Sequence, residues 1–226
     1  MEILLSAVAA GVIGALGPWV VARVPEPDEP DDDKRTYADI SRPRWLSPVL
    51  GVVAAAFAGA VAWGTDLPAL MPAWVLVTGV GAWLSYVDIR TRLLPYAIVA
   101  PLYMATWALV GLAALIEQDV QILVRALIAN VVVYVIFRVL YEIGRYFGGA
   151  LGYGDVRLAA VLALVLGPLG PQVTLAGLYA GFLVGAVAGV VLSLARLIDR
   201  KSFAFGQYLV LGAVVGATWG PALYGS

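Results

Sequence analysis

Two aspartates, far apart in the sequence, are the residues best suited to chemistry. Asp88 ends an apolar stretch in the segment 83–90, which reads WLSYVDIR, and Asp155 begins another in the segment 152–157, which reads GYGDVR. Two carboxylates a few ångströms apart cannot both ionise, so such a pair supplies a general base and a general acid together. This is what aspartic proteolysis requires, because one carboxyl activates water while the other protonates the carbonyl oxygen and later the leaving amine.

The composition removes most other catalytic chemistries. The chain contains no cysteine and no histidine, which excludes disulfides, thiolate zinc sites, cysteine nucleophiles and serine–histidine catalysis. Its 14 cations and 15 anions give a net charge of −1, which argues against a polyanionic partner such as nucleic acid. Any chemistry must use carboxylates, hydroxyls or cations, and we expect neither a metal nor a cofactor.

The elements that carry the aspartates have the composition of membrane helices. Apolar residues make up 62% of the 226 residues and charged residues 13%, whereas soluble domains have about 45–50% and about 25%. A bilayer core needs roughly 20 apolar residues per helix. Such runs lie near 3–22, 46–64, 68–87, 95–116, 122–142, 156–168, 172–196 and 206–223. The sequence therefore predicts an all-α polytopic membrane protein with about eight transmembrane helices.

The cations predict how these helices are oriented. All of the lysines and arginines except Arg125 lie in or next to the connections that follow the first, third, fifth and seventh predicted helices. Because cytoplasmic loops retain lysine and arginine, we expect both termini outside and both aspartates at the cytoplasmic ends of their helices. The predicted organisation is a first transmembrane helix at 1–22, a cytoplasmic acidic loop at 23–45, mobile at its proline-rich part 26–33, and a transmembrane core at 46–226.

The helix that begins near Asp155 is short, and a glycine-rich stretch precedes it. From Val156 to the break at Gly167 it has room for about 18 Å of helix, which is less than a bilayer core. Irregular backbone at membrane depth is tolerated only where protein or a water-filled cavity surrounds it. Gly152 and Gly154 also remove side chains where another backbone would have to approach the acid. These features predict a site at this helix end.

Other interpretations of the same residues compete with catalysis. An aspartate at the N-terminal end of a helix is typical of a cap, which fits Asp155. Asp88 stands at the C-terminal end of its predicted helix, where the helix dipole disfavours an anion. A carboxylate-based transporter would more often show inverted halves with broken helices, and a membrane scaffold would need neither acid. We interpret three further features as structural: a ladder of Gly177, Gly181, Gly185 and Gly189, the mid-helix Asn130, and the pair Arg138 and Glu142.

Three separated motifs resemble, in order and spacing, the type IV prepilin peptidases, which are bacterial GxGD-type aspartic proteases of the membrane. They are Asp88 with the residues up to Pro95, the segment 152–158 around Asp155, and the segment 204–213 that begins AFG. The resemblance spans about 83–213. It implies that Asp88 and Asp155 are catalytic. By position it also implies residues that shape the site or bind substrate: Gly152, Gly154, Arg157, Pro95, Phe205 and Gly206.

The resemblance implies a substrate class and a location as well. Substrates of that family are pilin or pseudopilin precursors, whose basic cytosolic leader is cut after a glycine at the membrane face. We therefore expect an endopeptidase of the bacterial inner membrane, active at its cytoplasmic face, with prepilin-like precursors and membrane lipid as partners. A closely related alternative is a GxGD protease that cuts flagellin-type precursors or transmembrane helices.

The sequence departs from the family pattern at three places. Arg157 stands where many members have lysine, and Tyr96 where many have asparagine or aspartate. Bifunctional members also carry a longer first loop with four zinc-binding cysteines and methylate the new N-terminus. The loop 23–45 has no cysteine, so zinc cannot bind there through thiolates. This departure argues against methyl transfer by this chain.

Overall fold

The computed structural model describes residues 1–26, 36–146, 151–194 and 204–224, and this part of the chain is helical with no strand. Nine α-helices follow one another within the described residues: α1 (Glu2–Val21), α2 (Tyr37–Ile40), α3 (Leu46–Gly64), α4 (Met71–Thr91), α5 (Tyr96–Glu117), α6 (Val120–Tyr146), α7 (Tyr153–Leu166), α8 (Pro171–Leu194) and α9 (Gly206–Tyr224). Short 3-10 turns, Pro68–Leu70 and Gly167–Leu169, precede α4 and α8.

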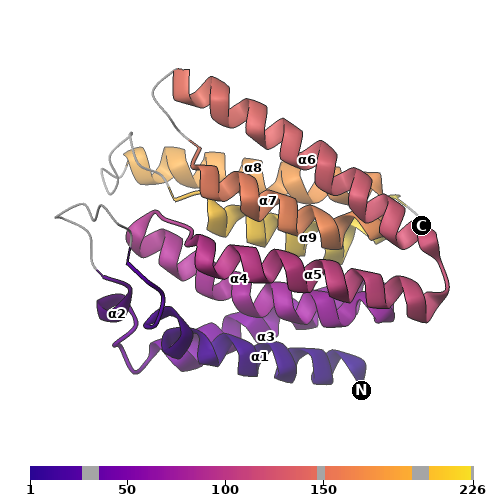
Figure 1. The fold of residues 1–226 in the computed structure, drawn as a ribbon, viewed down its shortest axis with the longest axis horizontal. Coiled ribbons are helices and arrows are strands. Elements are labelled where there is room, and N and C mark those ends of the chain that lie inside the picture. Colours follow the sequence, from indigo (N-terminus) through magenta and orange to yellow (C-terminus); the bar gives the residue numbers. More distant parts are fainter. Residues whose placement is uncertain (27–35, 147–150, 195–203, 225–226) are drawn as a thin grey trace.

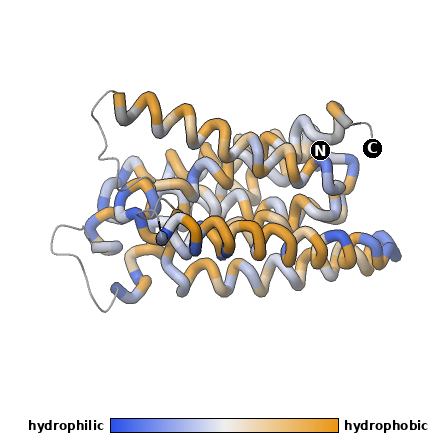
Figure 2. Tube along the Cα trace, turned by 90° about the horizontal axis from the view of Figure 1, so that it is seen from above, coloured by the Kyte–Doolittle hydropathy of each residue, from blue (hydrophilic) through white to orange (hydrophobic). Residues whose placement is uncertain are grey.

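The helices confirm the predicted fold class, because each of the eight predicted apolar runs corresponds to one of them. Six are long and apolar enough to cross a membrane, namely α1, α3, α4 with its preceding turn, α5, α6 and α8. Hydrophobic residues follow the lengths of the helices, and hydrophilic residues gather toward the ends of the bundle (Figure 2). The chain is an all-α polytopic membrane protein.

The helices lie side by side, and α7 occupies the interior of the bundle (Figure 1). It contacts α4, α5, α6, α8 and α9, and every residue from Leu158 to Leu166 is buried. This enclosure explains how a helix of only 14 residues is accommodated, since neighbouring protein rather than lipid surrounds its ends.

The direction of each helix brings three helix ends together. The C-terminal end of α4 and the N-terminal ends of α7 and α9 lie at the end of the bundle near α2, whereas α1 begins and α9 ends at the opposite end (Figure 1). Asp88 lies in the last turn of α4 and Asp155 in the first turn of α7. The two acids therefore share one end of the bundle.

A proline inside α1 shows how α4 is attached to it. Pro18 has no backbone N–H, so the carbonyl of Gly14 one turn earlier has no helical donor. The indole Nε1 of Trp83 donates to this oxygen and to that of Ile13, each at 3.0 Å. Gly17 leaves the space that the indole ring occupies. This contact fixes α4 on α1 just before the turn that carries Asp88.

The glycine ladder of α8 is a packing surface, as predicted for three of its members. A Cβ at Gly177 would lie 3.2 Å from the Gly212 oxygen and one at Gly181 would lie 2.9 Å from the Tyr208 oxygen, both on α9. A Cβ at Gly185 would lie 2.7 Å from the Phe205 ring. Side chains at these positions would push the two helices apart, so the glycines set how closely α9 approaches α8.

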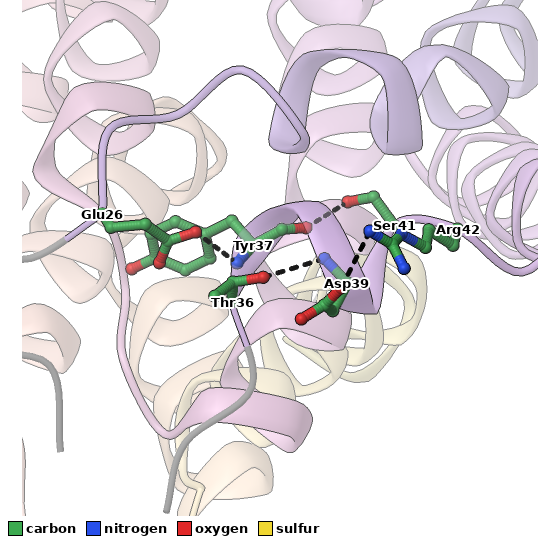
Figure 3. Close-up of polar contacts among 6 residues, drawn as sticks. All are labelled: Glu26, Thr36, Tyr37, Asp39, Ser41 and Arg42. Carbon is green, nitrogen blue, oxygen red and sulfur yellow. Dashed lines mark hydrogen bonds and ion pairs between the residues drawn. The ribbon is translucent and has the colours of Figure 1, made fainter. Parts of the chain in front are cut away.

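The short helix α2 was not predicted, because four residues are too few to produce a periodic pattern. The Oγ1 of Thr36 caps it by accepting from the Asp39 N–H at 3.1 Å, and the Ser41 hydroxyl donates to the Tyr37 carbonyl at 2.8 Å (Figure 3). Arg42 pairs with Asp39 at 3.3 Å. Local side-chain contacts thus define this single turn.

The second half of the predicted loop 23–45 packs on the bundle. Tyr37 and Ile40 are buried, and the Tyr86 hydroxyl of α4 donates to the Ile40 carbonyl at 2.8 Å. The Glu26 carboxylate accepts from the Tyr37 N–H at 2.7 Å (Figure 3). Of the segment predicted to be mobile, residues 27–33 lie outside the described part of the chain.

Candidate active site

Asp88 is buried at the end of α4 and receives a hydrogen bond from a distant helix. Only 4% of its surface is exposed, and its Oδ2 accepts from the Gly206 N–H at 2.8 Å. Gly206 is the first residue of α9, and a helix N-terminus favours a negative charge. The start of α9 therefore offsets the unfavourable position of an acid at the end of its own helix.

Asp155 is both a helix cap and a buried acid. Its Oδ2 accepts from the Gly152 N–H at 2.9 Å, which closes the first turn of α7. Its Oδ1 is buried and has no hydrogen-bond partner among the described residues, and 6% of the residue is exposed. Asp155 thus has the capping role that the sequence suggested, and this role uses only one of its two carboxylate oxygens.

The two carboxylates meet in front of Gly206. A Cβ built on this glycine would lie 3.1 Å from the Asp88 Oδ2 and 3.4 Å from the Asp155 Oδ1. The two oxygens therefore cannot be farther apart than the sum of these distances. Since glycine has no side chain, no atom of residue 206 occupies this position beside the two acids. The predicted convergence of Asp88, Asp155 and Gly206 is present in the structure.

The turn after α4 closes one side of this space. Arg92 ends α4 in the left-handed conformation, with φ of 57°, and Pro95 caps α5. Between them, Leu94 packs so closely on the first turn of α7 that a Cβ on Gly154 would lie 2.7 Å from the Leu94 Cβ. The Leu94 Cδ1 also lies 3.2 Å from the Cβ position of Gly206. Gly154 and the segment ending at Pro95 therefore shape the site through Leu94.

The family model described as the Type IV leader peptidase family matches residues 74–194, more than half of the chain, and this range includes both aspartates. The chain belongs to the type IV leader peptidase family. Comparisons with curated proteins and with solved structures gave no match. Membership makes the chain a prepilin peptidase-type aspartic protease, as the resemblance implied. The matched range ends before α9, so the contact of this leader peptidase's Gly206 with Asp88 is a finding of the structure.

Phe205 anchors the start of α9. Its ring lies 5.1 Å from that of Phe182 on α8, in the space that Gly185 leaves open. It is 8% exposed. The residue predicted to lie at the site thus holds the backbone of its neighbour Gly206, the residue that donates to Asp88.

Arg157 lies one turn beyond the start of α7 and stacks between two aromatic rings. Its guanidinium carbon is 4.5 Å from the ring centre of Tyr96 and 4.5 Å from that of Tyr153. Among the described residues, no ion pair joins Arg157 to an aspartate. Arg138 of α6 also lies near this cluster, 5.1 Å from the ring centre of Tyr153, and it pairs with Glu142 at 2.7 Å, as predicted.

A cavity of about 530 Å³ begins at this aromatic cluster and lies between α5, α6 and α7. We call it the lateral groove. Sequence reasoning missed it, although the polar Asn130 within an apolar helix was a signal. The residues that line it are Tyr96, Val99, Ala100, Tyr103, Met104, Asn130, Val131, Tyr134, Tyr153, Arg157 and Ala160.

Asn130 joins three helices in the wall of the lateral groove. Its Nδ2 donates to the Ala160 carbonyl of α7 at 2.8 Å, and its Oδ1 accepts from the Tyr103 hydroxyl of α5 at 3.0 Å. The predicted structural role of this residue is confirmed. Within the described residues, no group of three or more acidic side chains converges in a way that could hold a metal ion.

Proposed function

We propose that this chain cleaves the leader of type IV prepilin-like or pseudopilin-like precursors, and that Asp88 and Asp155 share the acid–base work. The observation that carries the proposal is the approach of two buried carboxylates, from the end of one helix and the start of another, to the Cβ position of Gly206. The leader peptidase family supplies the reaction class, and the geometry supplies a reason for these two acids.

The chemistry follows from placing two carboxylates in one buried space. Mutual repulsion favours a state with a single shared proton, so one carboxylate is a base while the other is an acid. The ionised carboxylate takes a proton from water, the water oxygen attacks the scissile carbonyl carbon, and the protonated carboxyl donates its proton to the carbonyl oxygen. The gem-diol then collapses, the C–N bond breaks, and a proton passes to the amine that leaves.

The backbone contacts of the site keep the acids fixed during these steps. The Gly206 N–H holds one oxygen of Asp88 and the Gly152 N–H holds one oxygen of Asp155. The second oxygen of Asp155 is buried and without a partner among the described residues, so it has a free acceptor position for a water molecule or a peptide group that enters the site. Because the protons are shared, the apparent pKa values belong to the pair rather than to either residue.

The distribution of cations supports a cytoplasmic active site, and the family resemblance implies that the membrane is a bacterial inner membrane. Arg90 and Arg92 flank the end of α4, and Arg138 and Arg145 lie toward the end of α6, at the end of the bundle where the acids meet. Such residues are retained on the cytoplasmic side. We assign 1–22 as the first transmembrane helix, 23–45 as a cytoplasmic loop without thiolate zinc, and 46–226 as the peptidase core.

The proposal is tested with purified protein and a precursor peptide that carries a basic leader, a glycine and an apolar helix. Mass spectrometry of the products locates the cut, which we expect after the glycine. A matched peptide with a neutral leader and a flagellin-type precursor measure how much the substrate class matters. A folded protein that leaves the prepilin-like peptide intact but cuts the flagellin-type precursor would contradict the proposed substrate.

A further inference from the structure

The lateral groove is open at the side of the bundle rather than enclosed within it. Met104 of α5 is 68% exposed and Val131 of α6 is 50% exposed, and both line the groove. Its floor is α7, where Ala160 is buried. An entering segment would therefore approach between α5 and α6 from within the apolar layer.

The lateral groove begins beside the aspartate site, at the first turns of the helix that carries Asp155, although neither Asp88, Asp155 nor Gly206 lines it. Tyr153 and Arg157, which line its mouth, lie two residues before and two residues after Asp155 on the first turns of α7. Tyr96 directly follows Pro95, at the end of the turn that closes the aspartate site. From Tyr96 to Met104 the wall formed by α5 rises about 12 Å, or roughly two helical turns.

The wall of the groove is prepared for an apolar occupant. Its apolar part consists of Val99, Ala100, Met104, Val131 and Ala160. The polar groups deeper in the wall already satisfy one another, because Asn130 binds both the Tyr103 hydroxyl and the Ala160 carbonyl. Covering the wall with an apolar segment would therefore leave neither the amide oxygen nor the amide nitrogen of Asn130 without a hydrogen-bond partner.

We propose that the lateral groove binds the first two turns of the apolar helix that follows the scissile bond of the substrate. This inference rests on the proposed function, since it assigns a place to one part of the same precursor. The aspartates act on the peptide beside the first turn of α7, and the groove holds the helix that continues from there into the apolar layer. Docking of this helix fixes which peptide bond lies between the two acids.

A pair of neighbouring valines allows a matched test. Val131 lines the lateral groove and Val132 does not, yet they are 50% and 49% exposed. We compare Val131→Trp and Val132→Trp on two peptides, one with leader and apolar helix and one that ends shortly after the cleavage site. Val131→Trp should raise the KM for the long peptide about tenfold, the effect of losing one well-packed interface residue, without changing kcat/KM for the short one. Val132→Trp should change neither the KM for the long peptide nor kcat/KM for the short one.

A second measurement does not depend on turnover. The chain has no cysteine, so Met104→Cys in an Asp88→Asn background provides a single thiol in the groove. A precursor with one cysteine in the first two turns of its apolar helix should form a disulfide with it. Leu115→Cys on the same helix, 76% exposed and outside the groove, should not, and equal crosslinking at both positions would overturn the proposal.

The outcomes separate the two proposals. If the wild-type protein cuts the long peptide and both tryptophan variants cut it with the wild-type KM, docking in the groove is refuted while the proposed function stands. If Val131→Trp releases bound phospholipid and leaves the kinetics unchanged, the groove holds lipid and the inference is likewise refuted. A folded wild-type protein that cuts no precursor refutes the proposed function, and the docking role falls with it.

Discussion

Replacing Gly206 by alanine places a methyl group against both acids. The new Cβ would lie 3.1 Å from the Asp88 Oδ2, 3.2 Å from the Leu94 Cδ1 and 3.4 Å from the Asp155 Oδ1. Contacts of this length require the neighbours to give way by a few tenths of an ångström. The methyl group also occupies space that water and the scissile carbonyl would need, so we expect the effect to fall on activity.

The size of the effect follows from the hydrogen bond at the same residue. A bond from a backbone N–H to a charged carboxylate contributes about 1.5–3 kcal/mol, and the Gly206 N–H holds Asp88 at 2.8 Å. Losing most of this interaction, with the acid displaced, corresponds to a fall of about 10²-fold in kcat/KM. Loss of this hydrogen bond should also lower the unfolding temperature by about 2–4 °C for each kcal/mol lost, whereas the crowding itself adds little because the crowded atoms belong to side chains that can shift.

The far end of the same helix supplies a matched control. A Cβ at Gly220 would lie 3.0 Å from the Val173 Cγ2 and 3.2 Å from its Cγ1, so crowding is comparable but remote from the acids. Rates of precursor cleavage by Gly206→Ala and Gly220→Ala are compared with thermal unfolding in the same detergent. Equal activity in the two variants would refute the reasoning, since position relative to the acids would then have no influence.

Three further predictions concern the acids and their supports. The pH profile of kcat/KM should be bell-shaped, because acid protonates the base of the pair and alkali removes the proton from its partner; a rate that rises steadily with pH would contradict this. Gly154→Ala should lower both activity and stability, by about 1–3 kcal/mol for stability, because its Cβ would lie 2.7 Å from the Leu94 Cβ; the measurements are cleavage rate and thermal unfolding. Trp83→Phe should destabilise the bundle by about 1–3 kcal/mol because it leaves the Gly14 carbonyl without its donor, and unchanged thermal unfolding would exclude this role.

Much of the fold could be predicted because apolar runs set helix positions directly. All eight runs correspond to α-helices, and all but the enclosed α7 are long, since a bilayer core requires spanning helices to be long and apolar. Helix ends were predicted less well. The helix predicted over 68–87, which is α4, continues to Thr91, because polar residues can remain helical. The Thr91 hydroxyl donates to the Val87 carbonyl at 2.8 Å.

The candidate site was predictable in its acids and less so in its surroundings. Asp88 and Asp155 could be identified from helix ends, glycines and charge, but no local pattern shows that the Gly206 N–H donates to Asp88, because 118 positions separate them. The lateral groove was missed for the same reason. Its residues come from three helices, and only the tertiary packing shows that Asn130 and Tyr103 face one another.

The most direct test of the aspartate pair measures precursor cleavage by Asp88→Asn, Asp155→Asn and the control Asp66→Asn, which changes an exposed aspartate between α3 and the turn before α4. Asparagine retains an oxygen that can accept the N–H of Gly206 or Gly152, so folding should survive. We predict that each of the first two variants loses about 10³-fold in kcat/KM while Asp66→Asn keeps wild-type activity. Cleavage at the wild-type rate by either Asp88→Asn or Asp155→Asn would contradict the shared acid–base role of the two acids.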